Sequence, residues 1–279
     1  MNYKTLGKDG PKLSEIGMGT YYDPLWIATA KSIGWTRGAS AKVEALKAGL
    51  DGGINLVDTA EIYGSEPLVA RAIRGRKREE LFVATKVWPN HLRRDALVRA
   101  LERSLRRLET HYVDLYQVHF SNSRVPIAET MAAMEEMKEK GKLLSIGVSN
   151  FSLQQLIEAS AALKKSQIAS NQVEYSLANR QIEAGLLPYC ESNGISILAY
   201  YPLGHGKLAG EGAKRKMEAI CKAYSKTPAQ VALNWLVSGH NIFAIPRASR
   251  AEHVKENLGA SGWEMRSEDK ALLETAFPR

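Results

Sequence analysis

The sequence predicts an α/β protein, a (β/α)8 TIM barrel with an N-terminal β-hairpin cap and a short C-terminal helix. Short β-rich runs alternate with longer segments of helical periodicity along nearly the whole chain. Eight strands with eight crossovers are the number that a closed barrel needs. No internal repeat, low-complexity tract or linker interrupts the chain. We therefore expect residues 1–279 to form a single domain.

The expected elements follow one another in a regular order. An N-terminal hairpin is expected from Tyr3–Leu6 and Lys12–Leu13, because Asp9-Gly10 between them favours a tight turn. The expected strands are Ile16–Gly19, Ile54–Val57, Leu81–Thr85, Val113–Val118, Leu143–Val148, Ser170–Glu174, Ser196–Tyr200 and Ile242–Ile245. The expected helices are Ala39–Gly49, Pro67–Arg74, Arg94–Leu108, Ile127–Lys140, Leu153–Ser160, Gln181–Glu191, Ala213–Tyr224, Pro228–Val237, Glu252–Leu258 and Ser267–Thr275.

Local signals support several of these boundaries. Ser152 and Thr227 are typical helix N-caps, and proline follows Thr227 in the first turn, where its missing N–H costs nothing. Gly141 and Gly194 are expected to end helices in the left-handed conformation.

Composition excludes several classes of protein. With 279 residues, 44% hydrophobic and 24% charged, the chain is neither a disordered tail nor a disulfide-stapled mini-protein. Two cysteines without a CxxC pattern predict no disulfide framework and no zinc site. No apolar segment is long enough to cross a membrane, and we expect a cytoplasmic protein.

The net charge of +8 is compatible with nucleic acid, a membrane surface or a phosphorylated small molecule. No nucleic-acid-binding motif is present. Four arginines at helical spacing, Arg99, Arg103, Arg106 and Arg107, are interpreted as a solvated outer face. We therefore expect a small-molecule partner, no nucleic acid and no membrane, and the oligomeric state stays open.

Four chemically active side chains are expected at one rim of the barrel. Active sites of such barrels form at the C-terminal ends of the strands. Asp58 and Tyr63 follow the second expected strand, Lys86 ends the third and His119 ends the fourth. A carboxylate, a phenol, an ammonium and an imidazole that converge in this way predict a catalytic site.

These groups suit acid–base chemistry on a carbonyl. A free phenol has a pKa of about 10, which a nearby ammonium lowers. We expect Lys86 to lower the pKa of Tyr63, and Asp58 to hold Lys86 in an ion pair. His119 is expected to donate a hydrogen bond to the carbonyl oxygen. The structural alternative is a stabilising Asp–Lys pair, with the tyrosine and the histidine as packing residues.

The motifs that surround these residues resemble those of the aldo-keto reductase family. They are Gly53-Ile-Asn-Leu-Val-Asp-Thr-Ala60 followed by Tyr63-Gly-Ser-Glu66, Thr85-Lys86, Asp114-Leu-Tyr116 through His119, Ile146-Gly-Val-Ser-Asn-Phe151 and Ile245-Pro-Arg247. The resemblance covers nearly the whole chain in order and spacing. It implies that Tyr63 is the general acid/base, that Lys86 and Asp58 tune it, and that His119 orients the carbonyl. Hydride would come from a nicotinamide cofactor.

The resemblance also implies a cofactor site across the same rim, without a Rossmann domain. Ser149, Asn150 and Gln172 would hold the nicotinamide carboxamide, and Tyr200 would stack on its ring. The Gly204–Ala209 loop fits a loose G-x-G-x-x-A pattern outside any βαβ opening turn, and its amides suit a pyrophosphate. The remaining cofactor contacts expected in the first part of the rim and in this loop are Gly19, Thr20, Asp58, Leu203, Gly206 and Lys207.

The segment after the last strand is expected to bind the adenosine end of the cofactor. Arg247, Ser249 and Arg250 stand immediately before a helix N-terminus, an arrangement that favours anions. By resemblance this is the 2′-phosphate site, and Glu256 and Asn257 meet the adenine. The resemblance therefore implies NADPH. His253 stands where many relatives have arginine, which weakens this inference, so NADH stays open as an alternative. Tyr201 likewise replaces a common serine.

The expected reaction is NADPH-dependent reduction of aldehydes, with ketones as a second substrate class left open, in a pocket walled by Tyr22, Trp26, Trp88 and Phe120. A non-catalytic NADPH-binding subunit is the alternative within the same fold. A metal-dependent isomerase or hydrolase using Asp58, His119 and Glu174 is disfavoured because Lys86 would repel a cation, and no metal is expected. Schiff-base chemistry at Lys86 is disfavoured because an acidic partner keeps lysine charged.

Overall fold

The structure is a computed structural model that describes residues 1–22, 24–32 and 38–278. Within these residues, eight strands pair in one parallel sheet in the order β10-β9-β8-β7-β6-β5-β4-β3. Two parallel bridges, Ile16 with Ala244 and Gly19 with Arg247, join its two edges, so the sheet curls on itself. The strands are β3 (Met18–Gly19), β4 (Leu56–Asp58), β5 (Phe82–Val87), β6 (Val113–Val118), β7 (Leu143–Ser149), β8 (Ile168–Glu174), β9 (Ser196–Tyr200) and β10 (Ile242–Ala244).

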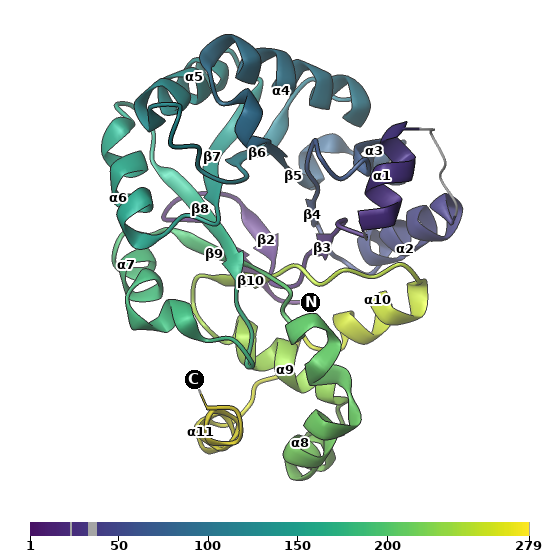
Figure 1. The fold of residues 1–279 in the computed structure, drawn as a ribbon. Helices are drawn as coiled ribbons and strands as arrows, with labels where there is room; N and C mark the ends of the chain where they lie inside the picture. Colours follow the sequence, from purple (N-terminus) through teal and green to yellow (C-terminus); the bar gives the residue numbers. More distant parts are fainter. Residues whose placement is uncertain (23, 33–37, 279) are drawn as a thin grey trace.

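Helices surround the curled sheet as an outer ring (Figure 1). They are α1 (Pro24–Ser32), α2 (Ala39–Asp51), α3 (Glu66–Ile73), α4 (Arg94–Leu108), α5 (Ile127–Glu139), α6 (Leu153–Ala162), α7 (Leu186–Ser192), α8 (Glu211–Tyr224), α9 (Pro228–Val237), α10 (Ala251–Leu258) and α11 (Ser267–Ala276). Short 3-10 turns are η1 (Arg78–Glu80), η2 (Pro89–His91), η3 (Gln181–Ala184) and η4 (Gly204–Ala209). Because helices cover the sheet, every residue of β5 and β6 is buried, as parallel strands require.

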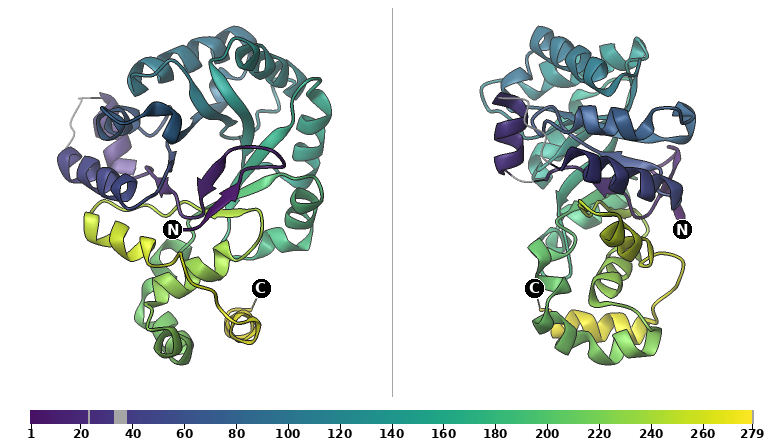
Figure 2. Two further views of the ribbon diagram at one scale, coloured as in Figure 1. Left: turned by 180° about the vertical axis from the view of Figure 1, so that it is seen from behind. Right: turned by 90° about the vertical axis from the view of Figure 1, so that its right-hand side faces the viewer.

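The N-terminal hairpin covers one end of the sheet. Strands β1 (Tyr3–Thr5) and β2 (Lys12–Ser14) pair antiparallel and lie across the sheet in the rear view (Figure 2, left). Leu6 and Leu13 are buried in one apolar cluster with residues of β4, β5, β6, β9 and β10. The hairpin is confirmed, but its left-handed residue is Gly7 (φ 61°) and not Gly10.

The expected helix ends are confirmed at four positions. Ser152 and Thr227 each form a reciprocal capping box, with Gln155 and Gln230 as partners. Gly141 and Gly194 have φ values of 67° and 64°, in the left-handed region where glycine has no steric cost.

The expected single helix Gln181–Glu191 is wrong. The chain forms η3, turns at Gly185 and starts α7 at Leu186. A continuous helix would place Pro188 in its interior, where the ring clashes with the carbonyl of Ala184. In α7 the same proline falls in the first turn, where it is tolerated. Helix α1 was not expected at all, although Pro24 at its first position is a typical start signal.

Candidate active site

A buried ion pair lies beneath the candidate site. Asp58 ends β4, and Lys86 lies in the neighbouring strand β5. The Lys86 ammonium donates to both Asp58 carboxylate oxygens, at 2.8 and 2.7 Å, and to the carbonyl of Thr59 at 2.9 Å. Gln172 of β8 adds a bond from Nε2 to Asp58 Oδ1 at 2.8 Å. Both charges are therefore compensated inside the protein, which is the condition for keeping an ion pair away from water.

Tyr63 and His119 lie above this pair. The Tyr63 hydroxyl is 3.3 Å from Nε2 of His119, and the Lys86 ammonium is 4.9 Å from the centroid of the Tyr63 ring. Tyr63 belongs to the loop after β4, and His119 follows β6, so the parallel sheet brings them together from distant parts of the chain. The structure thus assembles all four expected catalytic residues, as the convergence of strand ends predicts.

Burial sets the protonation of these groups. It raises the pKa of Tyr63 well above the usual value, and the Asp58 charge raises it further. Burial, and then the charge of Lys86, lowers the pKa of His119 to about 2. The expected lowering of the pKa of Tyr63 is wrong in this structure, because desolvation of the phenol and the charge of Asp58 both raise this pKa. At neutral pH the site presents a neutral phenol beside a neutral imidazole.

Aromatic rings form the wall of the cleft next to these residues. The cleft has a volume of about 910 Å³. His119 and Phe120 stack at 5.1 Å between ring centroids, and Trp88 meets both rings edge-on at 5.3 and 5.9 Å. Tyr22 lines the same cleft, as expected. Trp26 does not line it: the indole is buried behind Tyr22, with their ring centroids 5.8 Å apart.

Polar side chains also line the cleft. Ser149, Asn150 and Gln172 lie at the ends of β7 and β8, next to Tyr200 at the end of β9. Tyr200 donates its hydroxyl proton to Asn150 Oδ1 at 2.7 Å, and Asn150 donates from Nδ2 to the carbonyl of His119 at 3.0 Å. These four residues are therefore linked to one another and, through Gln172, to Asp58.

The loop after β9 borders the cleft with a run of left-handed backbone. Gly204, His205 and Gly206 have φ values of 55°, 56° and 87°. Successive residues of this kind turn backbone N–H groups toward one concave surface, which favours anions. Leu203 and Gly206 line the cleft as expected, whereas Lys207 does not. Tyr201, the residue that replaces serine, stacks on His205 with centroids 3.8 Å apart.

The segment expected to bind the adenosine end is only partly in the cleft. Arg247 lines it and donates from Nη1 to the backbone carbonyl of Tyr22. Gly19 and Asp58 line it as well. Thr20 is fully buried, and its hydroxyl bonds to the carbonyl of Asp58 at 2.9 Å, so this side chain faces the protein interior. The remaining expected residues lie outside the cleft lining, before or on α10: Ser249, Arg250, His253, Glu256 and Asn257.

Sequence reasoning missed several residues of the cleft. Tyr21 meets the Tyr63 ring edge-on at 5.2 Å, and its place beside the end of the first strand could have indicated it. Ile62 and His205 also line the cleft. The expectation that the four arginines of α4 form a solvated face is correct for only two of them. Arg107 bonds to buried Glu66 at 2.5 Å, and Arg103 lies 4.0 Å from buried Glu61.

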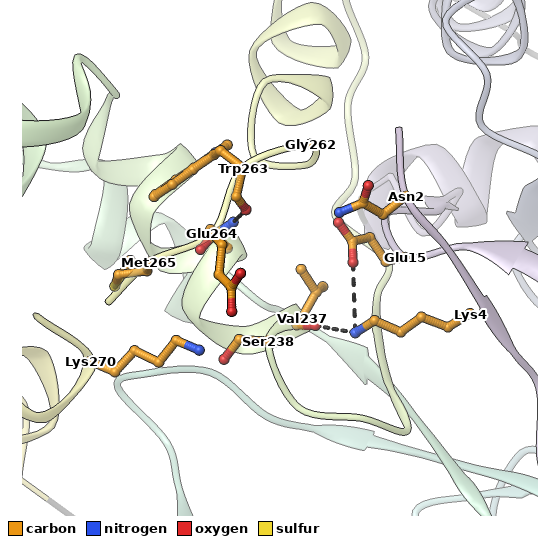
Figure 3. Close-up of a pocket in the computed structure, with 11 residues that line it drawn as sticks. Asn2, Lys4, Glu15, Val237, Ser238, Gly262, Trp263, Glu264, Met265 and Lys270 are labelled. Atoms are coloured by element: carbon orange, nitrogen blue, oxygen red, sulfur yellow. Dashed lines mark hydrogen bonds and ion pairs between the residues drawn. The ribbon is translucent and has the colours of Figure 1, made fainter. Parts of the chain in front are cut away.

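A second cavity of about 440 Å³ lies near the hairpin (Figure 3). Lys4 lines this cavity. The ammonium donates to the carbonyls of Val237, Gly239 and Ile242 and lies 3.7 Å from Glu15. Its donors are thus directed at the end of α9, which indicates a structural role.

Two other site classes find no support in the described part of the chain. No group of three or more histidine, cysteine, aspartate or glutamate side chains is arranged there to hold a metal. Across the same residues, no helix has both the length and the apolar character of a membrane span.

Comparison with known proteins agrees with this geometry. The model of the "Aldo/keto reductase family" matches residues 30–276. Methylglyoxal reductase YeaE of Escherichia coli is 36% identical over 95% of this chain and 92% of its own length. Aldo-keto reductase YhdN of Bacillus subtilis is 32% identical, with 99% and 93% covered.

Solved structures give the same result. The thermostable aldo-keto reductase Tm1743, crystallised with the inhibitor epalrestat, superposes with a TM-score of 0.91 at 40% identity, covering 99% of this chain and 100% of that one. An aldo-keto reductase of Klebsiella pneumoniae, in complex with NADPH, superposes with a TM-score of 0.88 at 34% identity, covering 100% of this chain and 96% of that one. Sequence motifs, fold and site geometry therefore agree that this chain belongs to the aldo-keto reductase family, as an NAD(P)H-dependent oxidoreductase.

Proposed function

We propose that this chain reduces aldehydes to alcohols with NADPH, and that Tyr63 donates the proton. The observation that carries this proposal is the Tyr63 hydroxyl, 3.3 Å from His119 Nε2, in an aromatic cleft above the Lys86–Asp58 pair. A neutral phenol can donate its hydroxyl proton to a carbonyl oxygen that binds beside it. The curled sheet also supports the closed (β/α)8 barrel on which the proposal rests, because two bridges join its edges.

The polar half of the cleft fits a nicotinamide dinucleotide. Gln172 donates its amide N–H to Asp58, which leaves its Oε1 as the acceptor for a carboxamide N–H. The left-handed loop offers backbone N–H groups to a pyrophosphate, and a Cβ built on Gly206 would meet only open space. Arg247 and Arg250 supply positive charge for a 2′-phosphate. When bound, NADPH supplies hydride to the substrate carbonyl carbon.

The residues of the chain supply the remaining chemistry. The neutral imidazole of His119 and the phenol of Tyr63 bracket one position, where the carbonyl oxygen is oriented. As that oxygen gains negative charge, Tyr63 donates its proton to it. The Lys86 ammonium, 4.9 Å from the ring centroid, then stabilises the phenolate that remains. Trp88 and Phe120 provide an apolar wall for the rest of the substrate.

A panel of aldehydes and ketones, assayed with NADPH and with NADH, tests the proposal. Methylglyoxal is the first choice, because relatives carry the name methylglyoxal reductase. We expect oxidation of NADPH that depends on the aldehyde. NADPH binding measured by fluorescence, without turnover of any carbonyl, would instead favour a non-catalytic NADPH-binding subunit.

A further inference from the structure

A buried carboxylate that the reaction does not use lies two residues before Tyr63. The side chain of Glu61 is 7% exposed. Its Oε1 accepts the backbone N–H of Trp88 and accepts from Nδ1 of His91 at 3.0 Å. Its own backbone N–H donates to the carbonyl of Lys86 at 3.2 Å. Glu61 thus bonds to the segment 86–91 at three points.

These contacts join two parts of the site that belong to different loops. Glu61 is on the loop after β4, which carries Tyr63, whereas Trp88 follows β5. The Trp88 ring packs edge-on against His119 at 5.3 Å and against Phe120 at 5.9 Å. A displacement of the Trp88 backbone would therefore move the wall against which a substrate packs.

A comparison with Glu66 separates this role from a purely structural one. Glu66 is also buried and begins α3, directly after the same loop, and it bonds to Thr85 Oγ1 at 2.8 Å and to Arg107 at 2.5 Å. Neither of these partners lines the cleft. Glu61 differs because its partner Trp88 is a cleft residue. Burial of a carboxylate is costly unless hydrogen bonds compensate it. Breaking the bond to the Trp88 N–H would therefore cost free energy, which keeps the Trp88 backbone in place.

We infer that Glu61 is a positioning residue, whose carboxylate holds the Trp88 segment against the cleft and so controls how tightly bulky carbonyl substrates bind. The effect on substrate binding rests on the proposed reductase function. The positioning of the Trp88 segment does not, because the bond to the Trp88 N–H exists whatever the reaction is. The two parts of the inference can therefore be tested separately.

The variants E61M and E61Q test this inference, with E129A as the matched control. Methionine fills the space of Glu61 without an acceptor, whereas the glutamine amide oxygen can still accept the Trp88 N–H. Glu129 also accepts a backbone N–H, that of Arg94, at 3.1 Å, but Arg94 does not line the cleft. If E61M does not fold, E61A replaces it. The measurements are amide hydrogen exchange at Trp88, and kcat and KM for 4-nitrobenzaldehyde and methylglyoxal.

We expect E61M to accelerate exchange at the Trp88 amide by about tenfold or more, since a hydrogen bond to a charged group contributes at least this factor. The displaced wall should raise KM for 4-nitrobenzaldehyde. KM for methylglyoxal, which is too small to reach the wall, should rise less. In E61Q, exchange at Trp88 and KM for 4-nitrobenzaldehyde should stay close to the values of the unmodified protein. E129A should change neither.

Unchanged exchange at Trp88 in E61M overturns the inference. So does an equal loss of kcat for both aldehydes with unchanged KM, which E61Q does not rescue. If the unmodified protein reduces no carbonyl compound, the proposed function fails. Exchange at Trp88 then decides alone whether Glu61 holds the segment.

Discussion

Replacement of Tyr63 by phenylalanine removes the proposed proton donor and keeps the ring. The hydroxyl makes one hydrogen bond, to His119 at 3.3 Å, so its loss should lower the free energy of unfolding by only ~0.5–1.5 kcal/mol. General acid catalysis contributes about 10²–10⁴ in rate. At ~1.36 kcal/mol for each factor of ten, kcat should fall by an amount that corresponds to roughly 2.7–5.5 kcal/mol. The expected effect on catalysis thus exceeds the effect on stability.

The assay follows the loss of NADPH absorbance with methylglyoxal, and NADPH binding is measured separately by fluorescence. Binding should persist in Y63F, because the ring still borders the cleft. Y116F is the control: Tyr116 is a fully buried tyrosine of β6 outside the cleft, so it tests the loss of a buried hydroxyl alone. A kcat of Y63F within a few fold of the unmodified protein would refute the assignment of Tyr63 as the proton donor.

Further predictions concern the charges of the site. K86M leaves Asp58 as a buried carboxylate without its cation and should lower the free energy of unfolding by ~3–5 kcal/mol. The double variant K86M/D58N should regain part of this loss. Equal denaturation midpoints for the single and double variants would contradict the pairing. The double variant R247A/R250A should raise KM for NADPH far more than for NADH with kcat nearly unchanged, and equal losses with both cofactors would mean that these arginines do not bind the 2′-phosphate. The pKa of His119 is about 2 in the folded state and ~6.5 in the unfolded chain, so the unfolded state binds more protons below pH ~6.5. Stability should therefore fall as the pH decreases from ~6.5 to 5, by roughly 2 kcal/mol, and a denaturant titration in which H119Q loses as much over this range would exclude the histidine as the cause.

The sequence predicted the order of strands and helices and the rim at which the chemistry gathers. Hydrophobic periodicity is a local property, and the end of each strand can be located without knowing its neighbours. Asp58, Tyr63, Lys86 and His119 could therefore be assigned to one rim from chain position alone. Ser152 and Thr227 could be recognised as caps for the same reason.

Properties that depend on surroundings could not be predicted in this way. Lys86 was expected to lower the pKa of Tyr63, but the outcome depends on desolvation and on the direct bonds between Lys86 and Asp58, which arise only after β4 and β5 pair. The same limit applies to Glu61, whose carboxylate meets Trp88 across two loops.

By itself, then, the sequence determined the fold class, the positions of the strand ends and the types of functional group at the site, because periodicity and residue type are local properties of the chain. Only the tertiary structure decided which charges are neutralised, which hydroxyls face the interior and which of the expected residues reach the cleft. Thr20 and Trp26 fall behind its surface, whereas Tyr21 enters it. These outcomes depend on distance and burial, which elements separated in the chain acquire only by packing together.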